Sequence, residues 1–235
     1  MGEIRYTNQE GVARMVLCNP SARNAMSEKM MMEFADIVQQ MEEEPPRILL
    51  LIGEGTKSFC SGGDLRDVRS SLIEKGQKMS EMMNDLTLRI KNIPMFVIVG
   101  VEGAAIGGGA ELVTLGDWVI ASKTARIQFV QVLLGVSTGW GGGQRLLQKC
   151  PQKAIHMLLG GKFSVLELHH FGLVDQIAES GCVRDICEEK IQELLTIPTV
   201  SMCGILELIR TPEREIDIFS SLWGGEVHRT LLEKK

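Results

Sequence analysis

The chain has 235 residues, 44% of them hydrophobic, which is enough to bury the core of one large domain or of a domain with a small appendage. A net charge of −5 at pH 7, with no basic run longer than two residues, argues against nucleic acid or an anionic membrane as a partner. No apolar stretch reaches the roughly 18 residues of a membrane-spanning helix, and the six cysteines form no CxxC pair, so we expect reduced thiols and a cytoplasmic location.

The first fifty residues predict a hairpin, a helix and a buried strand. The runs EIRYT and VARMVL flank the turn NQEG, which is typical of two antiparallel strands. Ser27 is a suitable N-cap for a helix through SEKMMMEFADIVQQMEEE, and Pro45 and Pro46 end that helix. The apolar run RILLLIG then predicts a strand buried on both faces.

The remainder predicts an α/β core followed by helices. A helix is expected around EMMNDLTLRIKN, followed by the buried strand MFVIVGV. The segment ELVTLGDWVIAS predicts a short helix that leads into a third strand, and the chain beyond about Gly139 is mainly helical in pattern. We therefore expect an α/β fold, with a core over residues 1–180 and a helical C-terminal region over residues 181–235.

Two loops rich in small residues follow the buried strands. They are SFCSGGDL at residues 58–65, with a helix expected to start near Asp64, and GAAIGGGAEL at residues 103–112. Parallel neighbouring strands bring such loops to one edge of a sheet, where their N–H groups can form an oxyanion hole. The glycine loop at 103–112 contains no GxGxxG pattern, and the chain contains no GxxxxGK[ST] pattern. Tight packing of helix against strand is the alternative explanation for the glycines.

Four segments resemble the crotonase superfamily, the enoyl-CoA hydratase/isomerase group. They are NPSARNAMS, SFCSGGDL, VEGAAIGGGAEL and GWGGGQRL, and the resemblance covers most of the chain. It implies a spiral of ββα turns, an acyl-CoA thioester substrate, an enolate-type intermediate and a homotrimer or dimer of trimers. It implies no cofactor beyond the coenzyme A carried by the substrate, and we see no set of metal ligands in the sequence.

The resemblance also implies roles for individual residues. The two oxyanion donors of the family fall on the backbone N–H groups of Gly63 and Gly108. The segment SARNAM is expected to lie along coenzyme A, which places Ala22 and Asn24 near the ligand, with Ser61 at the same tunnel. Trp140 borders the acyl-side loop and is placed with the substrate-binding residues, although its large apolar ring also suits core packing.

Glu111 follows Gly108 by one helical turn and is the best acid/base candidate. Hydratases that resemble this chain use a second glutamate on the next loop, where this sequence offers only Gln131. No Asp or Glu occurs between Asp117 and Glu167. Hydration needs paired acid/base groups, so this deficit disfavours a hydratase and weakens the case for an isomerase.

Decarboxylation needs less from the protein. Loss of a carboxylate beside a thioester gives the same enolate without a base that removes a proton. The segments GGGAEL, GWGGGQRL and FSSLWGGEVHRTLLEKK resemble decarboxylases of this superfamily, which implies ethylmalonyl-CoA or methylmalonyl-CoA as substrate. The alternatives are a hydratase or isomerase, or a catalytically weak binding protein. Glu111 either protonates the enolate or serves only the structure.

Overall fold

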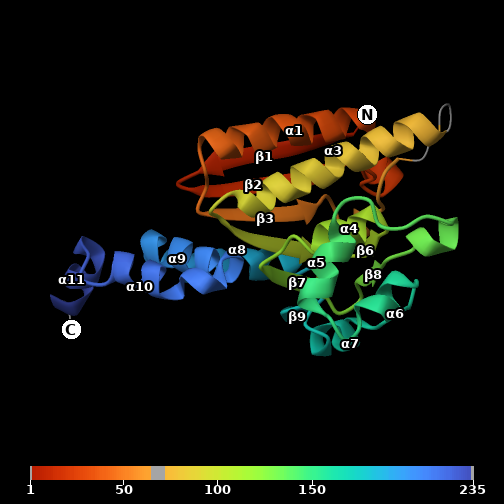
Figure 1. The fold of residues 1–235 in the computed structure, drawn as a ribbon. Coiled ribbons are helices and arrows are strands. Elements are labelled where there is room, and N and C mark those ends of the chain that lie inside the picture. Colours follow the sequence, from red (N-terminus) through yellow and green to blue (C-terminus); the bar gives the residue numbers. More distant parts are fainter. Residues whose placement is uncertain (1, 65–71, 234–235) are drawn as a thin grey trace.

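A six-stranded sheet forms the larger layer of the computed structural model, which describes residues 2–64 and 72–233 (Figure 1). Its order is β1-β2-β3-β5-β7-β9, with β1 and β2 antiparallel and the remaining neighbours parallel. The strands are β1 (Glu3–Gln9), β2 (Val12–Cys18), β3 (Ile48–Gly53), β5 (Phe96–Val101), β7 (Trp118–Ser122) and β9 (Gln176–Ala178). The predicted hairpin and the three predicted buried strands are confirmed.

A second sheet consists of three short parallel strands, each of which follows a strand of the first sheet in the chain. It has the order β4-β6-β8 and consists of β4 (Ser58–Cys60), β6 (Ala104–Ile106) and β8 (Arg126–Gln128). Each of β3, β5 and β7 is therefore followed by a short strand of the small sheet and later by a helix, which is the expected spiral of ββα turns. The glycine loops begin at the ends of β4 and β6, so neighbouring strands bring both loops to one edge.

Two aspartates fasten successive turns of this spiral. Asp117, just before β7, accepts a hydrogen bond from the backbone N–H of Val97 at 2.8 Å and forms an ion pair with Lys91. Asp175, just before β9, accepts one from the backbone N–H of Val119 at 2.7 Å. A buried backbone N–H without a partner is costly. Each aspartate therefore stabilises the point where one turn of the spiral meets the next.

Two long helices, α1 (Glu28–Glu43) and α3 (Leu72–Asn92), lie side by side over the upper edge of the molecule (Figure 1). Ser27 caps α1 by accepting a hydrogen bond from the Met30 N–H at 3.3 Å, as predicted, and the helix ends before Pro45. The apolar face of α1, which includes Met30, Phe34 and Met41, is buried in the main core. α3 begins nine residues earlier than the predicted run EMMNDLTLRIKN.

Most of the remaining chain is helical, as expected beyond Gly139. The helices are α4 (Gly108–Val113), α5 (Gly142–Lys149), α6 (Ala154–Leu158), α7 (Val165–His170), α8 (Val183–Leu195), α9 (Thr199–Arg210), α10 (Glu215–Leu222) and α11 (Glu226–Glu233), with 3-10 turns at Pro20–Ala22, Gln131–Leu134 and Pro212–Arg214. α8 packs its buried side chains against the large sheet, and Met202 and Leu206 of α9 belong to the same hydrophobic cluster. α10 and α11 lie farther from the sheet (Figure 1). The division at residue 180 stays a prediction.

Several short elements differ from the sequence-based expectation. The loops at 58–65 and 103–112 each contain a three-residue strand, and β8 and β9 were not predicted. Three residues give too little alternation to be read as a strand. The helix expected to start near Asp64 falls on residues 65–71, which lie outside the described residues. Among the described helices, none alone has the length and apolarity to span a membrane; one pair, α8 and α9, passes that test together but is bent by 106°.

Candidate active site

A cavity of about 180 Å³ lies at the edge of the small sheet where both glycine loops end. The segment at residues 130–140 forms its other wall. Its lining includes six of the eight predicted site residues, namely Ser61, Gly63, Gly108, Glu111, Gln131 and Trp140. The structure therefore brings together residues that are up to 79 positions apart in the sequence.

Gly63 lies in a loop that is fixed from one side. Met26 donates its N–H to the carbonyl of Gly62 at 2.8 Å and accepts the N–H of Asp64 at 2.9 Å, so both neighbours of Gly63 pair with one short segment. No described residue accepts a hydrogen bond from the N–H of Gly63 itself. This N–H is held in place by its neighbours and is available to a ligand.

Gly108 supplies a second available donor. It is the first residue of α4, where a backbone N–H has no acceptor within its own helix. Gly107 precedes it with a φ of 58° and donates its own N–H to the carbonyl of Gln128 at 2.9 Å, which orients the start of the helix. The two loops approach closely, since a side-chain carbon built on Gly62 would lie 3.1 Å from the Gly108 nitrogen. Two fixed N–H donors from separate loops can stabilise an oxyanion.

The indole of Trp140 packs against the glycines of both loops. A Cβ atom built on Gly108 would lie 2.6–2.7 Å from three carbons of the ring, and one built on Gly63 would lie 3.7 Å from Cζ2. The side chain is only 3% exposed. Trp140 was predicted either to contact the substrate or to pack in the core. Its ring is part of the core and also part of the cavity wall. Gly108 must lack a side chain here for steric reasons.

The carboxylate of Glu111 is buried and accepts four hydrogen bonds. Oε1 accepts from the Gln131 amide at 2.8 Å and from the N–H of Gly139 at 3.2 Å. Oε2 accepts from the N–H groups of Trp140 at 2.8 Å and Gly142 at 2.9 Å. All four partners are donors, which suits an ionised carboxylate that only accepts. The geometry thus shows a structural task for Glu111, and its acid/base role stays a prediction.

The side chain of Gln131 has one polar atom without a hydrogen-bond partner among the described residues. Its amide nitrogen is used by Glu111, while its Oε1 is buried without a hydrogen-bond partner among the described residues. It begins the 3-10 turn Gln131–Leu134 at the cavity wall. Sequence reasoning placed Gln131 here, but it could not show that the amide is already committed to Glu111.

Arg145 supports the same wall and was not predicted. Its guanidinium donates to the carbonyls of Glu111 at 3.2 Å and Trp140 at 2.9 Å, and to the hydroxyls of Thr87 at 3.0 Å and Thr114 at 2.9 Å. Burial lowers the pKa of Arg145 to about 10, and the charge of Glu111 opposes that change. Its place in GWGGGQRL, two residues after the last glycine, was the available sequence signal.

The predicted coenzyme A residues divide into two kinds. Ser61 lines the cavity, and its hydroxyl donates to the carbonyl of Ala22 at 3.1 Å, so Ala22 lies beside it. Asn24 is 1% exposed, and its amide donates to the carbonyls of Glu54 and Ser58. The Asn24 side chain is thus committed to the protein itself, and the expectation that Asn24 lies near coenzyme A stays a prediction. Its amide fastens the turn at residues 19–25 to the small sheet.

No three His, Cys, Asp or Glu side chains come together as a possible metal site within residues 2–64 and 72–233. Among the described residues that line the cavity, Glu111 is the one titratable group. The described lining therefore offers backbone N–H donors, one carboxylate, the Gln131 amide, apolar side chains and the hydroxyls of Ser61, Ser80 and Ser137.

Comparison with known proteins gives consistent matches. A family model described as enoyl-CoA hydratase/isomerase matches residues 7–209. The chain is 30% identical to the ethylmalonyl-CoA decarboxylase of Danio rerio, over 99% of this chain and 83% of that protein, and 28% identical to that of Mus musculus, over 97% and 75%.

Solved structures are also similar. An enoyl-CoA hydratase from Polaromonas sp. JS666 superposes with a TM-score of 0.88 at 27% identity, over 100% of this chain and 98% of that one. An enoyl-CoA hydratase/isomerase structure from Mycobacterium abscessus gives a TM-score of 0.91 at 24% identity, over 98% and 95% of the two chains, which supports the fold alone.

The contact between Gly108 and Trp140 yields a first prediction. We expect Gly108→Ala to lower the free energy of unfolding by roughly 1–3 kcal/mol, because the added methyl group overlaps the indole. In a Trp140→Phe background, the same substitution should cost less, since the smaller ring leaves room. Denaturant unfolding of the four proteins of this double-mutant cycle measures the difference. Equal costs in both backgrounds would contradict the steric coupling.

The four donors around Glu111 yield a second prediction. Glu111→Gln replaces one of the two accepting oxygens with an NH₂ group. The donors to that oxygen, either Gly139 or both Trp140 and Gly142, then lose their acceptor. We expect a loss of roughly 1–3 kcal/mol for each donor left unpaired, measured by thermal and denaturant unfolding. Glu81→Gln on the exposed face of α3 is the matched control and should stay within about 0.5 kcal/mol. A stable Glu111→Gln protein would overturn the structural role.

Proposed function

Because the chain belongs to the enoyl-CoA hydratase/isomerase family, we propose that it acts on an acyl-CoA thioester and removes CO₂ from a short branched malonyl-CoA. Ethylmalonyl-CoA and methylmalonyl-CoA are the proposed substrates. The relatives named ethylmalonyl-CoA decarboxylase, at about 28–30% identity, support this reaction class. The chain needs no resident cofactor for it in this proposal.

The single observation that carries the proposal is the composition of the cavity wall. Two N–H donors, from Gly63 and Gly108, have no described acceptor, while the one lining carboxylate is held by four donors. Gln131 stands where a second carboxylate is expected in a hydratase. The wall is thus better suited to stabilise an enolate than to remove a proton or activate water.

The proposed reaction proceeds by heterolysis of one carbon–carbon bond. The thioester oxygen accepts hydrogen bonds from Gly63 and Gly108. The bond from the α-carbon to the carboxylate breaks, CO₂ leaves, and the electron pair delocalises onto the thioester oxygen as an enolate. A proton from water then adds to the α-carbon and gives the saturated acyl-CoA. Each oxyanion donor contributes about 3 kcal/mol to such a step in comparable sites.

The same wall favours release of the carboxylate. No cationic side chain occurs among the described residues that line the cavity. The nearest charged group on the wall is Glu111, and Gln131 offers an unpaired carbonyl oxygen. A substrate carboxylate in this environment is not stabilised by an ion pair. The neutral CO₂ product needs no ion pair, and the enolate is stabilised by the N–H donors, so the reaction relieves an unfavourable ground state.

We also infer a homotrimer or a dimer of trimers in which the C-terminal helices make contacts between copies. α9, α10 and α11 form an extension at one end of the molecule (Figure 1). They expose large hydrophobic side chains, including Ile209 at 69%, Ile216 at 73% and Trp223 at 65%. Exposed apolar side chains gathered on one extension are typical of an interaction surface.

Comparing two reactions tests the function directly. We expect purified protein to release CO₂ from ethylmalonyl-CoA or methylmalonyl-CoA at least 100-fold faster than it hydrates crotonyl-CoA, because hydration lacks its second carboxylate. Release of CO₂ and the product thioester can be followed by coupled assay and mass spectrometry. Efficient hydration without CO₂ release would identify a hydratase. Binding of coenzyme A with neither reaction would identify a binding protein.

A carboxylate at position 131 should impair the proposed reaction. We expect Gln131→Glu to lower CO₂ release at least tenfold. The substitution removes the donor to Glu111 and adds a charge beside both Glu111 and the proposed position of the substrate carboxylate. Two like charges about 4 Å apart repel by roughly 1–4 kcal/mol. Gln148→Glu, on the exposed side of α5, adds the same charge elsewhere and should leave turnover unchanged. If a folded Gln131→Glu protein decarboxylates at the normal rate, the proposed carboxylate position is wrong.

A further inference from the structure

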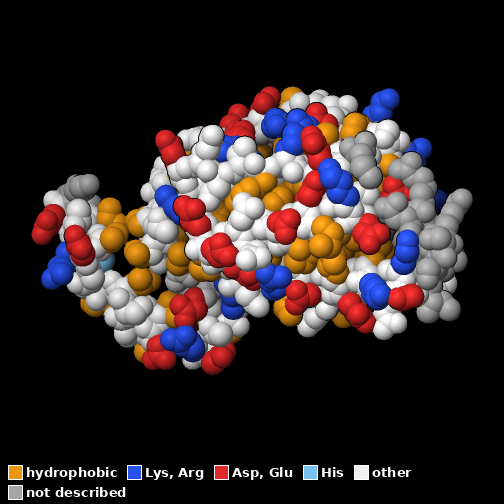
Figure 2. All heavy atoms as spheres, turned by 90° about the horizontal axis from the view of Figure 1, so that it is seen from above, with side chains coloured by type: hydrophobic (Ala, Val, Ile, Leu, Met, Phe, Trp, Pro, Cys, Tyr) orange, Lys and Arg blue, Asp and Glu red, His pale blue; other side chains and the backbone are white. Residues whose placement is uncertain are grey.

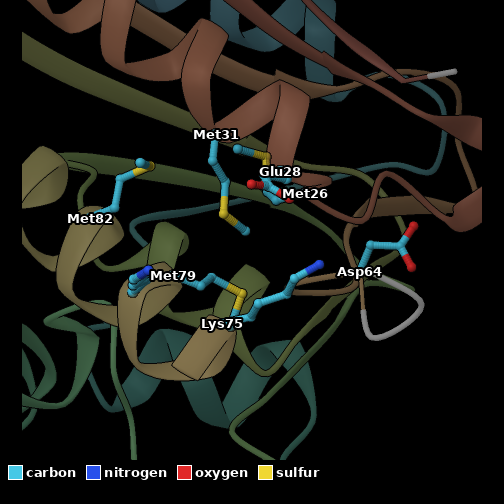
Figure 3. A pocket seen from close by; sticks show the side chains of 8 residues that line it. Met26, Glu28, Met31, Asp64, Lys75, Met79 and Met82 are labelled. Atoms are coloured by element: carbon cyan, nitrogen blue, oxygen red, sulfur yellow. The ribbon is translucent and has the colours of Figure 1, made fainter. Parts of the chain in front are cut away.

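A second cavity, of about 160 Å³, lies between the N-terminal part of α1 and α3 (Figure 3). Four methionines line it, and we call it the methionine pocket: Met26, Met31, Met79 and Met82. We propose that this pocket receives the α-alkyl branch of the substrate and that Met79 and Met82 set the branch length that the protein accepts. The inference rests on the proposed function for the identity of the thioester and extends it to branches longer than ethyl.

The methionine pocket adjoins the candidate active site through one side chain. Met79 lines both cavities. Its sulfur would lie 2.8 Å from a Cβ atom built on Gly63, so it packs directly against an oxyanion glycine. Met26 approaches from the other side, because it forms the backbone bridge with the segment around Gly63. The flexible thioether of Met79 therefore separates the reacting centre from the pocket.

The position suits a group attached to the α-carbon. When the thioester oxygen accepts hydrogen bonds from Gly63 and Gly108, the α-carbon lies within two bonds of that oxygen and close to Met79. An alkyl branch that passes Met79 enters the methionine pocket. In this proposal the carboxylate faces the Glu111 and Gln131 wall, which belongs to the catalytic cavity and is not lined by Met26, Met31 or Met82.

The walls of the pocket match an alkyl chain in chemistry and size. Figure 3 shows Met31 from α1 and Met79 from α3 projecting toward one another across the space. Thioether side chains are apolar and adjust their shape to what they contact. Apolar cavities of about 150 Å³ hold a molecule the size of benzene. The pocket can therefore take a branch of several carbons, well beyond methyl.

Charged groups complete the lining without opposing this assignment. They are Glu28, Asp64, Lys75 and Lys78, and Lys78 forms an ion pair with Glu74 at 2.7 Å. Figure 2 views the molecule from the α1 and α3 side, where hydrophobic side chains are exposed among charged ones. An apolar interior with charged groups around it lets a chain of limited length bind and keeps its end near water.

A binding series tests the pocket without relying on turnover. Butyryl-, hexanoyl- and octanoyl-CoA carry the alkyl group of the branch and lack the carboxylate. We expect their dissociation constants for the wild-type protein, measured by calorimetry, to fall about two- to fourfold per added methylene from butyryl to hexanoyl. Wild-type affinity that does not change with chain length would overturn the proposal.

Met82→Trp should block the pocket, because Met82 lines it and does not line the catalytic cavity. We expect this variant to lose the gain in affinity from butyryl-CoA to hexanoyl-CoA. Leu88→Trp, on the exposed side of the same helix, is the matched control and should keep the full series. If Met82→Trp binds the longer thioesters as the wild type does, the pocket is not the branch site.

Met79→Ala provides a test that does not depend on the folding of Met82→Trp. Shortening the separating side chain should raise the preference for hexanoyl-CoA over butyryl-CoA at least threefold, and an unchanged preference would overturn the role of Met79. Turnover gives a separate readout, since butylmalonyl-CoA should exceed methylmalonyl-CoA in kcat/KM for the wild type, whereas the reverse order would contradict the branch assignment. If no CO₂ is released from any substrate but the binding series holds, the proposed function fails while the pocket stands.

Discussion

The buried carboxylate of Glu111 is the interaction on which the candidate site depends. It joins α4, which supplies the Gly108 donor, to the segment at 139–142, which carries Trp140. Without these hydrogen bonds, three backbone N–H groups of that segment would need other partners in a region closed to water. Arg145 donates hydrogen bonds to the carbonyl of Glu111 in α4 and to the carbonyl of Trp140. Backbone donors and backbone acceptors therefore both have partners where these two elements meet. The carboxylate of Glu111, which the family resemblance suggests for acid/base chemistry, thus also has a structural role.

The spiral explains why the two donors lie close together at all. Each turn of the chain adds one strand to the large sheet and one to the small sheet, and the parallel register keeps successive turns aligned. Loops that follow equivalent strands therefore end at the same edge. Asp117 and Asp175 stabilise the points where successive turns meet, although Asp175 lies more than 60 residues after Gly108 in the chain. The geometry of the donors is in this sense a product of the whole repeat.

Local sequence signals predicted much of this, and long-range contacts account for what they missed. Ser27, the proline pair and the apolar runs mark helices and strands because their effect is local, and the glycine loops were found for the same reason. The three-residue strands β4, β6 and β8 are stabilised by pairing with one another, which no local pattern records. Asn24 is an example, because its sequence position does not reveal that its buried amide donates to the carbonyls of Glu54 and Ser58. The partners of Glu111 and the methionine pocket likewise come from segments far apart in the sequence.

The packing of Trp140 against Gly63 and Gly108 has a consequence for how this chain can diverge. A larger residue at position 108 is excluded while the indole is present, and a smaller residue at position 140 would leave a void beside both oxyanion loops. Neither position can drift alone without loss of stability, so a viable lineage has to change them together or through a destabilised ancestor. The three positions therefore form one coupled packing unit, in which the ring present at position 140 limits the side chain that position 108 can carry.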